Sequence, residues 1–309
     1  MSGAVESFRD VGRRLSNWGR WGEHDQLGTL NLIDPADIVR AAALVRTGKV
    51  FDLSIPLDES GPQRGVNGRH NVIHTITIAD GTSFPAGMFL ADDMAVLSLQ
   101  GATQWDSLAH VGYDGLLYNG VPVSNVTVRS GARRNGIDRL GPRVVGRGLL
   151  LDVPRALGCD AFVDDHEITP DDLEAAETAH GVTVGRGDIL LLRTGWIRLL
   201  HGGDAQTFMA NVAPGIGLAA CEWLHARGVA AVATDTQAVE VKPPRDPEAS
   251  HPVHMVLIRD VGMTLGEMFD LEELAADCAA DGAYEFLFSA QPLKISGAVG
   301  SPITPVAVK

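Results

Sequence analysis

The hydrophobic positions of the chain fall into short runs of strand length that glycine residues bound. The segments RGLLLDV (147–153), GDILLLRTG (187–195) and VAAVATD (229–235) are such runs. Continuous apolar strands are typical of a sheet that is buried on both faces. The segment NVIHTITIA (71–79) alternates instead, which predicts a strand with one face in the core and one face in water. The pattern therefore predicts a buried central sheet and at least one half-buried strand.

Helical patterns separate these strands. They predict helices over residues 35–47, 169–181, 215–229 and 265–282, the last at least from Leu271. Asp34 and Thr169 stand where an N-cap is expected, each followed by a proline at the first helical position. The strands are too unevenly spaced, and too many lack a following helix, for a TIM barrel. We expect one α/β domain over residues 1–309, with a mixed sheet or small barrel and outer helices. Residues 1–50 would form a helical arm that packs on the core or on a neighbouring subunit.

Composition narrows the class of protein. The formal net charge is −14 at pH 7, whereas a nucleic acid or an anionic membrane surface requires a basic face. No apolar run reaches the roughly 18 residues of a membrane-spanning helix, and the N-terminus carries no signal-peptide pattern. The three cysteines are far apart, which fits reduced thiols in a cytoplasmic protein. The expected partner is a small-molecule substrate, with neither nucleic acid nor membrane.

The densest polar cluster, QGATQWDSLAH (100–110), directly follows an apolar strand. Gln104, Asp106 and His110 offer an amide oxygen, a carboxylate and an imidazole, and they share one face if the chain is extended. Such a set can bind a divalent metal or perform acid–base catalysis. The alternative is a polar loop in which Asp106 caps a turn and His110 packs in the core. The segment alone leaves both interpretations open.

A second cluster, His251-Pro-Val-His254, precedes Glu267. A histidine and a glutamate from neighbouring elements, joined by an aspartate from a distant loop, would form a nitrogen and oxygen site for zinc or manganese. The alternative is that Glu267 is an exposed acid at the start of a helix, where the helix dipole favours it.

The first cluster resembles a motif of the cyclase family, which includes kynurenine formamidase and isatin hydrolase. Members of that family carry H-x-G-T-H-x-D-x-P-x-H, and this chain has Q-x-A-T-Q-x-D-x-L-x-H. Asp106 and His110 match, whereas Gln100 and Gln104 replace the two leading histidines. The TQWD form is similar to a branch that resembles trans-dienelactone hydrolase. The resemblance continues through WGEHDQLGTLN (21–31), GDILLLRTGW (187–196), ATDTQAVE (233–240) and HPVHMVLI (251–258).

The resemblance implies a swivelling β/β/α fold and a metal-dependent hydrolase. Because the leading histidines that hold one metal in two-metal members are replaced, we expect one divalent ion per chain, zinc or manganese. By residue-wise transfer, His254 and Glu267 are ligands, and Asp106 or Gln104 completes the set. His110 matches the family histidine that transfers protons.

The implied reaction is the opening of a small lactone, cyclic amide, or N-formyl or N-acyl amide by a metal-activated water. The candidate substrate-binding residues are Arg69, His74, Trp105, Gln100 and His251.

Relatives associate as homodimers or homotetramers, so a closed homo-oligomer is expected. Two other functions stay open: a non-catalytic small-molecule-binding protein on the same fold, and a polyketide-type cyclase.

Overall fold

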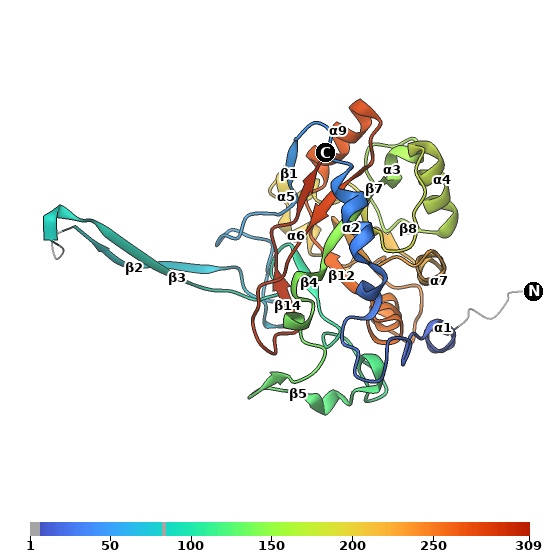
Figure 1. The fold of residues 1–309 in the computed structure, drawn as a ribbon, viewed down its shortest axis with the longest axis horizontal. Coiled ribbons are helices and arrows are strands. Elements are labelled where there is room, and N and C mark those ends of the chain that lie inside the picture. Colours follow the sequence, from blue (N-terminus) through green and yellow to red (C-terminus); the bar gives the residue numbers. More distant parts are fainter. Residues whose placement is uncertain (1–6, 82–84) are drawn as a thin grey trace, which may run out of the picture.

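One curled sheet forms the centre of the molecule in the computed structural model, which describes residues 7–81 and 85–309 (Figure 1). Its nine strands lie in the order β1 (Val50–Asp52), β15 (Val306–Val308), β13 (Glu285–Ser289), β7 (Val145–Asp152), β9 (Ile189–Arg193), β11 (Ala231–Thr234), β12 (Thr264–Glu267), β4 (Gln104–Asp106) and β14 (Gly300–Pro302). The central strands β7, β9, β11 and β12 are parallel, and the flanking strands pair antiparallel. The predicted mixed α/β fold is confirmed.

The apolar central strands are buried because helices cover both faces of the sheet. Successive residues of β7 point to opposite faces, so Leu149 and Leu151 join one core cluster while Leu150 joins another. All three are fully buried. The continuous hydrophobic runs of the sequence are thus explained by a sheet with two covered faces.

Besides short 3-10 helices, the described chain has the helices α1 (Phe8–Leu15), α2 (Pro35–Ala42), α3 (Val153–Ala156), α4 (Pro170–His180), α5 (Arg198–His201), α6 (Ala205–Phe208), α7 (Leu218–Arg227), α8 (Pro252–His254), a π-helix over Met255–Val261, and α9 (Glu272–Asp281). The first core cluster includes residues of α1, α4, α7 and the π-helix, and the second includes residues of α9. Helix α2 packs against β7 and β13. None of these helices is long and apolar enough to cross a membrane.

The predicted helix boundaries are correct where capping residues define them. Thr169 and Asp172 form a capping box at the start of α4, and Gly181 ends that helix at a φ of +66°. Other boundaries differ. The predicted helix over 265–282 begins only at Glu272, because the chain over Thr264–Glu267 pairs as β12. Similarly, helix α2 ends at Ala42 rather than at residue 47.

Helix α1 packs on the core of its own chain. Phe8, Val11 and Leu15 are at most 5% exposed and belong to the first core cluster. Of the helical arm expected over residues 1–50, residues 1–6 lie outside the described residues.

Three further strand pairs lie outside the main sheet. Strands β5 (Val126–Thr127) and β6 (Gly131–Ala132) are antiparallel, and β8 (Glu167–Ile168) and β10 (Gly215–Ile216) are parallel. Strands β2 (Ile73–Asp80) and β3 (Leu90–Val96) form a long antiparallel arm that projects from the body (Figure 1). The prediction of a half-buried strand over 71–79 is wrong, because residues 73–79 are exposed on both faces of this arm.

Because helices cover both faces of the sheet, replacing a buried side chain of a central strand should destabilise the protein. Leu191 is fully buried in β9, so Leu191→Ala leaves a cavity and should lower the free energy of unfolding by about 2–5 kcal/mol. Val163→Ala is the control, since Val163 is 86% exposed, and it should change that free energy by less than about 0.5 kcal/mol. Urea unfolding of both variants checks this, and equal losses would contradict the assigned core.

Candidate metal centre

Residues far apart in the sequence meet at the seam between β4 and β12. The antiparallel register places Gln104 opposite Glu267, and the side-chain amide of Gln104 donates to Glu267 Oε2 at 2.7 Å. Asp106 lies two residues along β4, on the same face as Gln104. His254 approaches from α8, at the junction with the π-helix. π-helical segments are rare in proteins, and those that occur often lie at functional sites.

Two local features of the backbone, at Met268 and Gly300, accompany the close packing of β12 and β14 against β4. Met268, directly after Glu267, has a φ of +57°, a left-handed conformation that is uncommon for a residue with a side chain. Its N–H donates to Thr236 O, and its carbonyl accepts from the Thr103 hydroxyl at 2.6 Å. On the other side of β4, a Cβ at Gly300 would lie 2.4 Å from Gln100 Nε2. A side chain at position 300 would therefore displace the Gln100 side chain.

Asp106, His254 and Glu267 form a buried triad. Each offers one ligand atom, and these atoms lie within 4.8 Å of one another. His254 Nε2 is 3.2 Å from Glu267 Oε1 and 3.8 Å from Asp106 Oδ2. The interpretation of Glu267 as an exposed acid at a helix start is wrong, because it lies on a strand and is 4% exposed.

Unsatisfied oxygens mark this triad as a place for a cation. Neither carboxylate oxygen of Asp106 accepts a hydrogen bond within residues 7–81 and 85–309, and the same holds for Gln104 Oε1. Buried polar groups without partners are rare and costly. Burial raises the pKa of Asp106 above its ordinary value, and the charge of Glu267 adds to that effect, whereas His110 opposes it. One divalent ion would satisfy these oxygens together with His254 and Glu267.

A second carboxylate fixes the orientation of His254. The Nδ1–H of His254 donates to Glu240 Oε1 at 2.5 Å, and the backbone N–H of His254 donates to the same oxygen at 3.1 Å. Burial alone lowers the pKa of His254, but the bonds to Glu240 and Glu267 raise it to about 10. Since Nδ1 is held by Glu240, Nε2 faces Asp106 and Glu267. This carboxylate–histidine arrangement is typical of metal-binding histidines.

His110 stands at the edge of the triad. Its Nε2 lies 3.7 Å from Asp106 Oδ1, and its side chain is 20% exposed, in contrast to the fully enclosed Asp106. An imidazole that contacts both solvent and a buried carboxylate can accept and return a proton. The interpretation of His110 as a core residue is wrong, because it lines a cleft.

That cleft is about 500 Å³ in volume, and His110, His254 and Glu267 line it. Arg69, Gln100 and His251, which the sequence analysis names as candidate substrate-binding residues, line it too. The charge of Arg69 acts on the buried Asp106 and lowers the pKa of that carboxyl, against the larger effect of burial. The Nε2 of Gln100 is buried without a partner in the described part of the chain. The cleft thus offers hydrogen-bond donors beside the carboxylates.

Two predicted substrate-binding residues lie elsewhere. Trp105 is fully buried, packs edge-on against Phe269 and donates to Ala290 O at 2.9 Å, because alternate residues of β4 point to opposite faces. His74 lies on the projecting arm and pairs with Asp93 at 2.7 Å. Neither residue lines the cleft of this chain, which corrects their assignment as substrate-binding residues.

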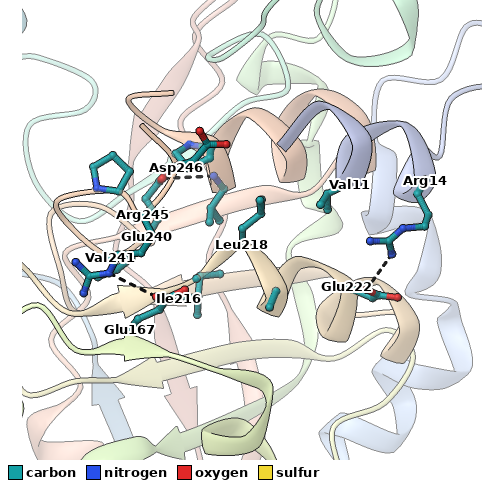
Figure 2. A pocket seen from close by; sticks show the side chains of 15 residues that line it. Val11, Arg14, Glu167, Ile216, Leu218, Glu222, Glu240, Val241, Arg245 and Asp246 are labelled. Atoms are coloured by element: carbon teal, nitrogen blue, oxygen red, sulfur yellow. Dashed lines mark hydrogen bonds and ion pairs between the residues drawn. The ribbon is translucent and has the colours of Figure 1, made fainter. Parts of the chain in front are cut away.

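A second cavity, of about 290 Å³, has Glu240 among its lining residues (Figure 2). Its middle is apolar, with Val11, Ile216 and Leu218 among the lining residues. Its charged residues are paired: Arg14 contacts Glu222 at 2.9 Å, and Arg245 contacts Glu167 at 3.5 Å. Among the described residues, none that lines this cavity has a buried polar atom without a partner, whereas Asp106, Gln104 and Gln100 at the other cleft do, so we assign the functional site there.

Sequence patterns alone do not identify two of the residues near the site. Glu240 and Gln237 lie within the segment ATDTQAVE, and nothing in their spacing points to His254. The sequence feature that could have pointed to Glu240 is its charge within the apolar stretch AVEV, which follows a buried strand. A buried glutamate in such a place requires a partner.

Comparisons with known proteins agree with this geometry. The Cyclase family model matches residues 51–241. The chain belongs to the cyclase family. A solved structure described as a novel cyclase is 41% identical, with 95% of this chain and 99% of that one covered at a TM-score of 0.88. No curated protein matches the chain.

More distant solved structures share the cyclase fold. Isatin hydrolase A from Ralstonia solanacearum is 21% identical, with 89% of this chain and 95% of that one covered at a TM-score of 0.64. A predicted metal-dependent hydrolase from Bacillus stearothermophilus is 19% identical, with 85% and 98% covered at a TM-score of 0.56. At these identities the likeness shows the fold.

The contact between Glu240 and His254 gives a prediction for this cyclase-family chain. Glu240→Gln keeps the shape of the side chain but removes its charge, so the affinity for Zn²⁺ should fall roughly 10- to 100-fold. Glu177→Gln is the control, since Glu177 is a buried glutamate of α4 that bonds Val184 and Arg227 instead. Competition with a chromophoric chelator measures both affinities. Equal affinity in wild type and Glu240→Gln would show that Glu240 does not support the ligand.

Proposed function

We propose that the chain is a metal-dependent hydrolase that opens a small lactone, cyclic amide, or N-formyl or N-acyl amide. The observation that carries the proposal is the buried triad of Asp106, His254 and Glu267, in which both Asp106 oxygens lack a hydrogen-bond donor among the described residues. Membership of the cyclase family supports it, as do structural relatives described as isatin hydrolase and as a metal-dependent hydrolase.

The donor set suits one zinc or manganese ion. Catalytic zinc sites have three protein ligands and leave a further position open for water, and one imidazole with two carboxylates supplies three ligands. Gln104 is placed to contribute its Oε1, which has no partner within the described chain, while its amide nitrogen is held by Glu267. Asp106 is the stronger ligand of the two, because a carboxylate is charged. Gln100 and Gln104 replace imidazoles, so a second ion would have weak ligands.

When bound, a divalent ion lowers the pKa of a coordinated water from 15.7 to about 7 and polarises a carbonyl group. The chain's own contribution is to hold and move the proton. His110 lies beside Asp106 at the exposed side of the triad, so it accepts the proton of the attacking water and returns it to the leaving nitrogen or oxygen. The neighbouring Asp106 carboxylate stabilises the imidazolium in between.

The remaining cleft residues suit the product as well as the substrate. Opening a lactone or a cyclic amide creates a carboxylate, and Arg69 presents a guanidinium to the same cleft. Gln100 and His251 offer further polar contacts at its wall. A cleft of about 500 Å³ is the size of a small-molecule site.

An activity panel tests the reaction class. Protein reconstituted with Zn²⁺ or Mn²⁺ is assayed against lactones, isatin-like cyclic amides and N-formyl amides. We expect hydrolysis of at least one class, abolished by chelation and restored by metal. No hydrolysis in any class with either metal, in protein shown to bind the metal, would favour a non-catalytic binding protein.

The donor set also predicts a stoichiometry. Elemental analysis of protein purified without chelator and loaded with metal should give close to one divalent ion per chain. The reason is that Gln100 and Gln104 leave a second position without imidazoles. Two tightly bound ions per chain, or none after loading, would contradict the assigned site.

Replacing a metal ligand and replacing a proton-transfer residue should have different effects on metal binding and activity. Glu267→Ala and His254→Ala should lose both metal and activity, and should lose the rise in melting temperature that metal gives the wild type. His110→Ala should keep its metal and its melting temperature, yet lose activity by roughly 10²- to 10⁴-fold. His24→Ala is the control, because His24 is 86% exposed. If His110→Ala loses metal as completely as Glu267→Ala, then His110 is a ligand.

A further inference from the structure

The second cavity is lined by residues of α1, α7 and α8 and of the segment that joins Glu240 to Asp246 (Figure 2). Val11 of α1, Leu218 of α7 and Val253 of α8 supply apolar side chains to its wall. Its volume of about 290 Å³ is roughly twice the 150 Å³ of an apolar cavity that holds one benzene ring. The space therefore suits a molecule of two fused rings.

The charged groups of this cavity favour an uncharged ligand. Four carboxylates and two guanidiniums line it, namely Glu167, Glu222, Glu240, Asp246, Arg14 and Arg245. Both guanidiniums already pair with carboxylates, Arg14 with Glu222 and Arg245 with Asp165. The excess of carboxylates repels an anion, and a cation would have to lose its hydration and compete with these guanidiniums. An uncharged apolar molecule meets neither obstacle, and it gains free energy by leaving water for the apolar middle of the cavity.

Part of the cavity wall also supports the metal ligand His254. Pro252 and Val253 directly precede His254 on α8. Glu240 accepts hydrogen bonds from the backbone N–H groups of Val253, at 3.4 Å, and of His254, at 3.1 Å, as well as from His254 Nδ1–H. Groups beside an unfilled space have fewer packing contacts than groups in a filled interior. A ligand in the cavity would therefore restrict α8 and Glu240, and would hold His254 in the orientation that binds an ion.

We propose that the second cavity binds a small uncharged aromatic molecule of two fused rings, and that its occupancy strengthens metal binding at the cleft. The second half of the proposal rests on the metal site of the proposed function, whereas the first half does not. Occupancy should raise the metal affinity by about fivefold or more, which is the lower end of the usual coupling between two sites. By linkage, the metal must raise the affinity for the aromatic molecule by the same factor.

Isothermal titration calorimetry of metal-free protein with 2-naphthol tests the first half. This probe has two fused rings and is uncharged at neutral pH, and its dissociation constant should lie below about 1 mM. The matched probe 2-naphthoate has the same rings and a carboxylate, so it should bind at least about tenfold more weakly. No binding of 2-naphthol, or equal binding of 2-naphthoate, would overturn the proposal.

A cavity-filling variant shows where the probe binds. Leu218→Trp places a ring in the cavity and should abolish the binding of 2-naphthol. Leu157→Trp is the control, because Leu157 is 40% exposed and does not line the cavity, and it should bind 2-naphthol as the wild type does. Binding that survives in a folded Leu218→Trp variant would contradict the assignment. Circular dichroism establishes that each variant is folded.

Anomalous diffraction with 6-bromo-2-naphthol locates the probe in wild-type crystals, so the test does not depend on the folding of a variant. A bromine peak beside Leu218 and Val253 is the expected result. A peak beside His110 in the metal cleft, or no peak at all, would overturn the proposal.

Competition for Zn²⁺ with a chromophoric chelator, with and without saturating 2-naphthol, tests the second half. The Zn²⁺ affinity should rise about fivefold or more with the probe bound, and the 2-naphthol affinity should rise by the same factor with Zn²⁺ bound. An unchanged Zn²⁺ affinity would overturn the regulatory role. These readouts are binding constants, so a chain that binds both ligands but hydrolyses no substrate would contradict the proposed function and leave this inference standing.

Discussion

Enclosure of the Asp106 carboxylate between β4, β12 and α8 is the constraint on which the site depends. A buried carboxylate with no hydrogen-bond donor is unstable unless it is protonated or compensated by a cation. Its neighbours offer both possibilities, because His254 and His110 lie within 4 Å while Glu267 adds negative charge. A divalent ion would resolve the conflict more completely than either histidine, since it would satisfy several oxygens at once.

The site is assembled by pairing of strands from distant parts of the sequence, rather than by one contiguous motif. Gln104 and Glu267 are 163 residues apart, yet the β4–β12 register places them side by side. The π-helix after His254 and the left-handed Met268 turn the chain at the two ends of the site. Glu240 accepts hydrogen bonds from the Nδ1–H and the backbone N–H of His254, and it also lines the apolar cavity of about 290 Å³. The unsatisfied buried oxygens at the triad, rather than the size of either cavity, are the reason to propose that cleft as the functional site.

The sequence predicts those parts that local patterns determine. Buried strands such as RGLLLDV and capped helices such as α4 follow from hydrophobic runs and capping residues. It also points to Asp106, His254 and Glu267 as the candidate ligands that the structure brings together. It does not predict Glu240, because a single acid in an apolar stretch gives no indication of its partner. The alternating segment 71–79 is misleading for a related reason: alternation indicates that one face of a strand is apolar, but not whether the body of the chain covers that face.

Anomalous diffraction from crystals of metal-loaded protein tests the central claim most directly, because it locates the ion without reference to activity. Data collected at the zinc or manganese absorption edge should show one peak per chain, within about 2.0–2.3 Å of His254 Nε2 and of carboxylate oxygens of Asp106 and Glu267. A peak at another position, or a fully loaded crystal in which these three side chains hold no ion, would contradict the account.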